Sequence, residues 1–156
     1  MRFIDLEYES DRPYWHVGDH VLFDHGLELE LDDGSTWSLI WEQAGTSEGL
    51  GIYPEPLLPN HLMAGRTFEA TRYWHRRGPR DIISVELGWS EGRLHEDAGV
   101  QTPDRCLREV VLVGHDREAV IVLGYGVDVL VYWSRVDARR AGYLTEHGRR
   151  RSAPTR

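Results

Sequence analysis

Apolar and polar residues alternate with a period of two along most of this chain. The alternation is clearest at residues 4–9 and 27–31, where apolar residues take every second position and acids fill most of the positions between them. A period of two is typical of β-strands that bury one face and leave the other in water. We therefore predict an antiparallel meander of about four strands within residues 2–42, at 4–9, 16–23, 27–31 and 37–42.

The stretch GLELELDDGSTWSLIWEQ, residues 26–43, predicts a hairpin within that meander. Asp33 and Gly34 supply the turn, because aspartate and glycine tolerate the positive φ angles of tight hairpin turns. The acids of these strands are then expected to face solvent. The side chains predicted to point inward are Leu27, Leu29, Leu31, Trp37, Leu39 and Trp41.

The rest of the chain predicts two short helices and four more strands. Residues 44–66 are rich in glycine and proline and predict an irregular excursion. A helix at Thr67–Arg77 is expected to stop at Gly78-Pro79, and a second runs from a Ser134–Asp137 capping box to about Leu144. The strands are expected at 81–89, 107–113, 119–123 and 127–133, and the middle two form a hairpin about residues 114–116. They are apolar on both faces, so we expect them to be central or covered.

The predicted fold class is α+β, β-dominated, with an antiparallel meander and hairpins and two short helices, one mid-chain and one C-terminal. At 156 residues the chain is most simply one domain, here residues 1–146, followed by a disordered basic tail at 147–156. The single Cys106 allows no internal disulfide. No apolar run approaches the roughly 20 residues that cross a bilayer, and the N-terminus lacks the apolar core of a signal peptide. We expect a cytoplasmic protein that does not bind membranes.

Charge is distributed unevenly along the chain. Residues 1–60 hold 13 acids and 2 arginines, a net of −11, whereas residues 61–156 hold 13 acids and 16 arginines, a net of +3. There is no lysine, which is typical of a bacterial genome of high GC content. An acidic half repels nucleic acid and attracts a basic partner, so we expect a protein partner of basic character and no nucleic acid. The oligomeric state stays open.

The acids of the first meander are the strongest candidate for a binding surface. A hard cation needs several oxygens within about 2.6 Å of one point, but Glu28 and Glu30 lie two apart on a strand, roughly 6.5–7 Å along it. The calcium-loop pattern is also absent. We therefore interpret these acids as a solvent-facing or protein-binding surface, with no catalytic residue. The predicted binding residues are Asp24, Glu28, Glu30, Asp32, Asp33 and Glu42.

Three other patterns carry possible chemistry. His16, His20 and His25 have the ligand types of a zinc or iron site, but turn and edge positions are the simpler interpretation, so we predict no metal and no cofactor. Gly88-Trp89-Ser90-Glu91-Gly92 matches the nucleophile elbow G-x-S-x-G after a predicted strand, yet no convincing helix follows it. We interpret it as a glycine-rich turn.

The remaining aromatic, thiol and arginine residues fit structural roles. Among the six tryptophans, alternation leaves Trp15 and Trp89 as exposed platforms and assigns the others to packing. Cys106 precedes an apolar run and is expected to be a small packed residue. Four arginines in the middle of the chain are expected to neutralise the acidic half of the sequence. They are Arg72, Arg76, Arg77 and Arg80.

Three segments, taken in order, resemble small bacterial immunity proteins found beside polymorphic toxins. They are WHRRGPRDIISV from Trp74, LREVVLVGHDREAVIVLG and VDVLVYWSRVDARR. The resemblance covers about half of the chain. It implies a small cytoplasmic binder that neutralises a toxin through a surface and has no catalytic residues.

The leading hypothesis is therefore a non-enzymatic, immunity-like protein that binds a basic partner through the acidic face. Two alternatives stay open. One is a small-molecule or carbohydrate-binding domain with exposed tryptophan, and the other is a serine hydrolase that uses Ser90.

Overall fold

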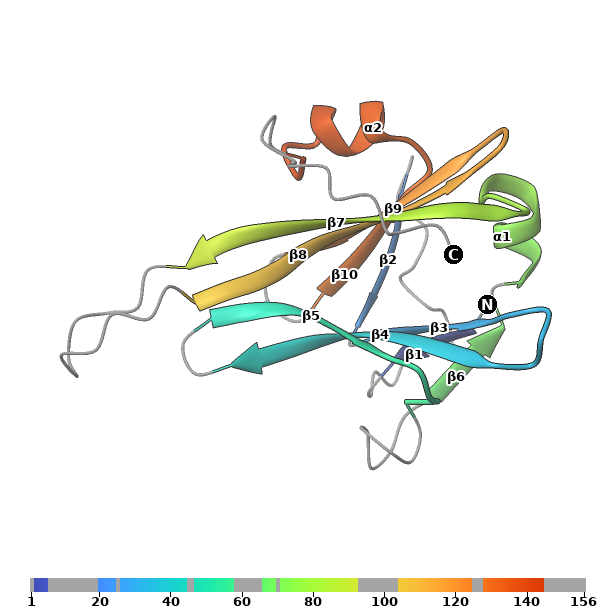
Figure 1. Cartoon of the computed structure of the whole chain (residues 1–156), viewed down its shortest axis with the longest axis horizontal. Helices are drawn as coiled ribbons and strands as arrows, with labels where there is room; N and C mark the ends of the chain where they lie inside the picture. Colours follow the sequence, from blue (N-terminus) through green and yellow to red (C-terminus); the bar gives the residue numbers. More distant parts are fainter. Residues whose placement is uncertain are drawn as a thin grey trace, which may run out of the picture.

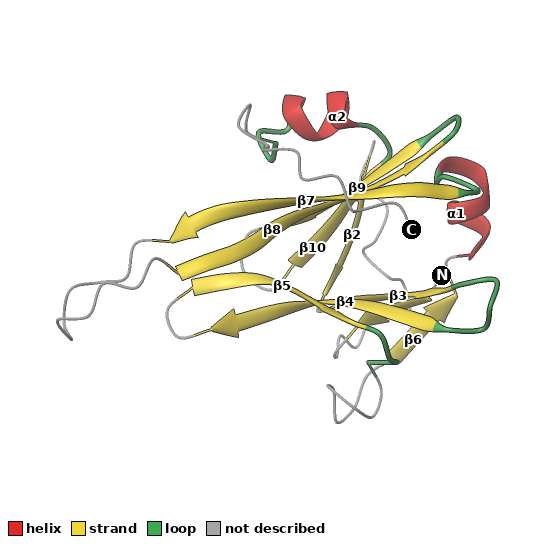
Figure 2. Ribbon diagram, viewed as in Figure 1, coloured by secondary structure: helices red, strands yellow, loops and turns green. Residues whose placement is uncertain are grey.

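The computed structural model describes residues 2–5, 20–24, 26–44, 47–57, 66–69, 71–92, 104–124 and 128–144. Within these residues, ten strands form two antiparallel sheets of five, and two short helices accompany them (Figures 1 and 2). The two sheets lie face to face with the largest apolar cluster between them. The β-dominated α+β class with two short helices is confirmed. No helix in the described ranges has the length and apolar character to cross a membrane.

The first sheet has the order β5-β4-β3-β1-β6. Its central hairpin matches the prediction: Leu27 pairs with Leu39, Leu29 pairs with Trp37, and Gly34 in the turn has a φ of 81°. Asp33 Oδ1 accepts hydrogen bonds from Ser35 N at 2.9 Å and Ser35 Oγ at 2.6 Å, which fixes the turn. The strands are β1 (Arg2–Asp5), β3 (Gly26–Glu30), β4 (Thr36–Ala44), β5 (Ser47–Tyr53) and β6 (Arg66–Glu69).

The second sheet has the order β2-β10-β9-β8-β7. Its central strands are buried on both faces, as predicted, because one face meets the first sheet and the other is partly covered by α2 (Arg135–Arg140). Ser134 Oγ accepts a 3.1 Å hydrogen bond from Asp137 N and donates a 2.6 Å hydrogen bond to Asp137 Oδ2. This confirms Ser134 as the N-cap of α2, although the helix ends four residues before Leu144. The strands are β2 (His20–Asp24), β7 (Ile82–Gly92), β8 (Asp104–Gly114), β9 (Glu118–Leu123) and β10 (Asp128–Tyr132).

The four-stranded meander predicted for residues 2–42 is wrong. β1 pairs with β3 and β6 in the first sheet, whereas β2 pairs with β10 in the second, so the chain changes sheets between β2 and β3. Alternation predicts where a strand lies and which face it buries. It does not determine the partner strand when that partner lies about a hundred residues further along the chain.

Two further predictions between residues 44 and 77 need correction. The stretch predicted as irregular contains β5, and the first residues of the predicted helix form β6. The helix itself, α1, spans Thr71–Arg77 and ends at the predicted stop, where Gly78 N donates a 2.7 Å hydrogen bond to Trp74 O.

The two sheets converge at one end and separate at the other (Figure 1). At the narrow end β5 meets β8 so closely that a Cβ added to Gly49 would lie 3.3 Å from Leu107 O. At the wide end, beside α1, the facing strands carry apolar residues that remain accessible. The fold therefore produces a wedge between the sheets, and this wedge forms the candidate site.

Candidate functional site

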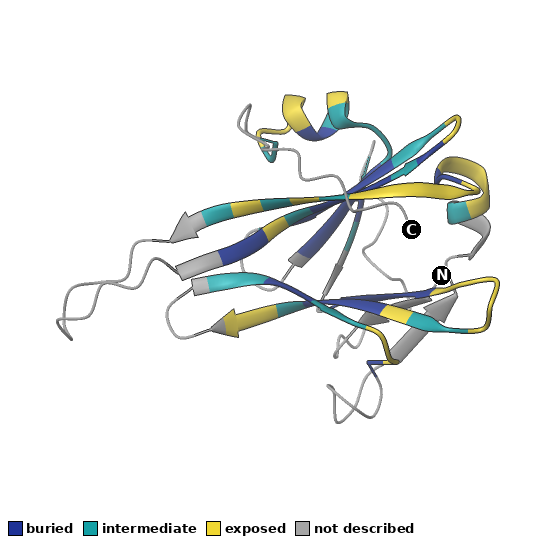
Figure 3. Cartoon of the chain, viewed as in Figure 1, coloured by how far each residue is buried: buried dark blue, intermediate teal, exposed yellow. Residues whose placement is uncertain are grey.

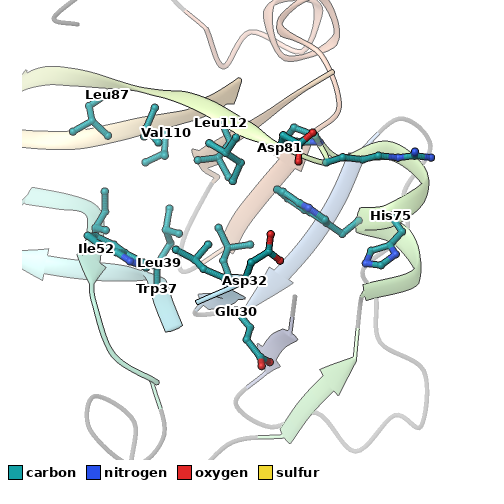
Figure 4. A pocket seen from close by; sticks show the side chains of 17 residues that line it. Glu30, Asp32, Trp37, Leu39, Ile52, His75, Asp81, Leu87, Val110 and Leu112 are labelled. Carbon is teal, nitrogen blue, oxygen red and sulfur yellow. The ribbon is translucent and has the colours of Figure 1, made fainter. Parts of the chain in front are cut away.

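A cleft of about 1100 Å³ opens between the sheets at their wide end (Figure 4). The first sheet lines it with the ends of β3, β4 and β5, and the second sheet lines it with β7 and β8. Small-molecule sites are typically clefts of roughly 300–1,000 Å³ with mostly apolar walls. The cleft therefore has the size and the wall chemistry of a ligand site.

Strand register places apolar side chains from neighbouring strands on the same wall. Val85 lies opposite Leu112 and Leu87 lies opposite Val110, so these four side chains share the inner face of the second sheet. The facing wall is built by Leu29, Trp37, Leu39 and Ile52, which follow the same pairing across β3, β4 and β5.

Trp74 of α1 also lines the cleft, at the end where the sheets separate. Its indole packs edge-on against Trp133, with ring centroids 6.1 Å apart. Gly78 permits this packing, because an added Cβ there would lie 2.7 Å from Trp74 Cδ2. The short helix therefore positions an aromatic side chain at the wide end.

Charged groups are confined to the rim. Asp32 from the β3–β4 turn and Asp81 from the start of the second sheet lie at the same end of the cleft, and His75 lies beside them (Figure 4). Arg80 also lines this end. The cleft thus has an apolar interior and a mouth with charges of both signs.

Glu28 was predicted to face solvent with the other acids, and this is wrong. Its side chain is only 3% exposed, and its Oε1 accepts a hydrogen bond of 2.8 Å from Leu57 N. Glu28 does point away from the inter-sheet core, but residues 53–57 fold back over that face of the sheet. Ser38 beside it is also buried and donates a 2.6 Å hydrogen bond to Glu55 O. Glu28 is therefore part of the structure under this segment and not part of a docking surface.

Glu42 has a local partner in the same segment. Its Oε1 accepts a hydrogen bond from the Tyr53 hydroxyl, and Gly51 leaves space for the pair, since an added Cβ would lie 2.7 Å from Glu42 Oε2. The hydrogen bond to Glu42, together with burial and the negative charge, raises the pKa of Tyr53 to about 12. The Tyr53 phenol therefore stays neutral up to a pH well above 10, the ordinary pKa of tyrosine.

This pair predicts a pH dependence. Because the folded-state pKa of Tyr53 is raised, its contribution to stability is present below pH 10 and is lost as the pH rises toward about 12. In an ultraviolet difference titration between the native protein and Tyr53→Phe, we expect one phenol to titrate near 12. Glu42→Gln should move that transition toward 10. A Tyr53 transition near 10 in the native protein would contradict the pairing.

Three of the other predicted acids are accessible. Glu30, Asp32 and Asp33 are exposed at the end of the hairpin, and the Glu30 carboxylate points away from the cleft (Figure 4). The two hydrogen bonds from Ser35 lower the pKa of Asp33. Asp24 lies in β2, but its side chain is outside the described residues. The structure thus separates the five predicted acids whose side chains it describes into a buried one, a paired one and a group of three exposed ones at the hairpin turn.

The G-x-S-x-G motif lies inside β7 and forms neither a nucleophile elbow nor the predicted turn. Ser90 Oγ accepts a 3.2 Å hydrogen bond from Arg108 Nε, and no histidine contact to it is seen in the described part of the chain. A nucleophile elbow requires a sharp strand-to-helix turn. The strand geometry at Ser90 does not provide it.

The histidine and cysteine predictions have different outcomes. His16 and His25 lie outside the described residues, and the His20 ring packs against Tyr132 at a tilt of 34°, with centroids 5.0 Å apart. Among the residues that the structure describes, no three histidine, cysteine or acidic side chains converge as a metal site would require. Cys106 is buried, which confirms the prediction of a packed residue.

Sequence reasoning missed the cleft because it treated every inward position as core. Leu31 and Trp37 line the cleft and so face the second sheet, but both are exposed. They lie at the turn end of the hairpin, where the sheets separate. Trp89 is 57% exposed, which confirms its prediction as an accessible aromatic.

The described chain forms a β-sandwich-like domain in which an apolar cleft opens between two antiparallel sheets. Comparisons with protein-family models, curated proteins and solved structures gave no match. The resemblance to immunity proteins therefore stays a prediction.

Proposed function

We propose that this protein binds an apolar small molecule in the cleft between its sheets. The observation that carries the proposal is the cleft itself, about 1100 Å³ in volume and lined by aliphatic and tryptophan side chains of both sheets. Accessible apolar surface in a folded protein is commonly a binding site. Burial of a ligand there gains roughly 25 cal/mol per Å² of apolar area removed from water.

The chemistry of the walls favours an apolar ligand over a sugar. A sugar presents many hydroxyls, and each one needs a hydrogen-bonding partner when it is buried. The described polar groups of the cleft lie at one end, around Asp32, Asp81 and Arg80. A ligand with an apolar body and one polar end fits this distribution.

A neutral hydrophobic dye, N-phenyl-1-naphthylamine, tests the proposal. We expect its fluorescence to rise on titration with the protein and to saturate at one dye per chain. Tryptophan emission should fall in parallel, because Trp37 and Trp74 line the cleft. If the dye signal stays at the level given by an equal concentration of an unrelated folded protein, the proposal is wrong.

A basic protein partner is a second candidate, and the exposed acids at the hairpin turn favour it. Glu30, Asp32 and Asp33 are accessible there, whereas Glu28 is excluded by its burial. This surface is smaller than the acidic face that alternation predicted. Its test is binding of a polyarginine peptide, which Asp33→Asn should weaken without changing dye binding, because Asp33, unlike Asp32, does not line the cleft. Unchanged peptide binding would exclude this surface.

A further inference from the structure

Strand β7 is a long apolar strand at the edge of the second sheet. It spans 11 residues and pairs with β8, and no other strand of the described chain pairs with it. Large apolar side chains along it remain exposed: Ile82, Ile83, Val85, Leu87 and Trp89. Figure 3 shows the exposed stretch of β7 above the buried strands of the same sheet.

This edge carries few of the devices that prevent strands from pairing between molecules. Those devices include short length, lysine, proline, inward-pointing charges and β-bulges. β7 has no lysine, arginine or proline, and Glu86 is bound by Arg135 NH2 at 3.1 Å on the face opposite Val85 and Leu87. The pairing with β8 shifts register twice: the extra residue is Ile83 of β7 at the first shift and Arg108 of β8 at the second. β7 itself is therefore regular from Ser84 onward, and this stretch can accept another strand.

We propose that β7 pairs antiparallel with β7 of a second copy of this chain, about a two-fold axis at Leu87. Opposed residues of an antiparallel pair share a face. A two-fold axis between the two strands must therefore pass midway between the two copies of one residue, which then lie opposite each other. The choice of that residue fixes all the other pairs.

The axis at Leu87 gives the best match of side chains. Leu87 then lies opposite Leu87, and Val85 lies opposite Trp89, which is the favourable pairing of an aromatic with a β-branched residue. On the other face Glu86 lies opposite Gly88. An axis at Glu86 would instead oppose two carboxylates, and an axis at Gly88 would place Val85 opposite Glu91 within the regular stretch. With the axis at Leu87, Glu91 falls opposite Ile83, the extra residue at which the regular stretch of β7 begins.

The pairing would also complete one side of the cleft. Val85 and Leu87 line it from the edge of the second sheet, so Trp89 of a second copy would lie beside Val85 at this opening. The dimer does not depend on the proposed ligand, because its contacts are made by β7 alone. It uses each β7 once, so the assembly closes at two chains.

Sedimentation velocity over a range of protein concentrations tests the dimer. We expect the native chain to sediment as a dimer at high concentration, and Leu87→Arg to sediment as a monomer, since it places two guanidinium groups opposite each other. Val136→Arg is the matched control, because Val136 is also an exposed apolar residue but lies on α2. It should remain a dimer. A native chain that is monomeric throughout, or a dimer unaffected by Leu87→Arg, overturns the proposal.

Disulfide trapping tests the register and does not depend on the folding of the arginine variant. In a Cys106→Ala background, Leu87→Cys should oxidise to a covalent dimer, because residues on the axis have Cβ atoms about 4.5–5.5 Å apart. Val85→Cys should not, since the two copies of residue 85 would be four positions apart along the strands, roughly 13 Å. Equal trapping at both positions, or none at Leu87, overturns the proposed pairing.

Discussion

Replacing Leu57 with alanine is expected to lower the free energy of unfolding by about 2–5 kcal/mol. Leu57 is fully buried, packs with Ile40 and Tyr53, and fills the space above Gly26, where an added Cβ would lie 2.6 Å from Leu57 Cδ1. The loss combines the transfer of the removed methyl groups with the cavity that they leave. Urea denaturation followed by circular dichroism measures it.

The effect of Leu57→Ala is large because this residue fixes the segment that covers Glu28. Its backbone N–H is the donor to Glu28 Oε1, so any shift of the segment weakens a buried hydrogen bond to a carboxylate. Val136→Ala is the control, since Val136 is 61% exposed and its truncation should change stability by no more than about 0.5 kcal/mol. If both variants lose the same small amount, residues 53–57 do not cover the sheet as described.

Replacing Leu31 with aspartate is expected to weaken binding of the naphthylamine dye by more than tenfold. Leu31 lines the cleft at the turn end of β3 and is exposed, so the substitution should leave the fold intact. A carboxylate in the wall either keeps its water, which prevents contact with the dye, or loses it at a cost in free energy when the dye binds. Both outcomes weaken binding. A tenfold change corresponds to about 1.4 kcal/mol. Fluorescence titration gives the two dissociation constants.

Val136→Asp provides the matched comparison for Leu31→Asp. It introduces the same charge in place of an exposed apolar residue, but on α2, away from the cleft. Its dye affinity should equal that of the native chain. If both aspartate variants weaken binding equally, the effect comes from net charge, and the cleft is not the dye site.

The local elements of this fold could be predicted from the sequence. The hairpin about Asp33-Gly34, the end of α1 at Gly78 and the cap at Ser134 all depend on residues within a few positions of one another. Backbone φ preferences, hydrogen-bonding side chains and alternation act at that range. The structure therefore matches the sequence prediction at these points.

The errors arise from contacts between distant parts of the chain. The placement of β2 depends on β10, more than a hundred residues away. The burial of Glu28 depends on Leu57, 29 positions further along. Alternation correctly placed Glu28 on the opposite face from Leu27 and Leu29, but it gave no sign that another segment covers that face.

The candidate site was beyond prediction for a related reason. Leu31 and Trp37 have the same pattern as Leu27 and Leu39, and all four face the second sheet. Leu31 and Trp37 are accessible because the sheets separate toward α1. At the opposite end the sheets meet, where Gly49 of β5 lies against Leu107 of β8. The angle between two sheets is a property of their packing and leaves no pattern in either strand.

The most direct test of the cleft as a ligand site is the position of the bound dye, measured by methyl NMR of the protein during titration with N-phenyl-1-naphthylamine. Binding in the cleft predicts saturable shifts at Leu31, Leu39, Ile52, Val85 and Val110, with Val136 and Val120 unchanged. Shifts that leave these cleft methyls unchanged, or that grow without saturation across the whole surface, would contradict it.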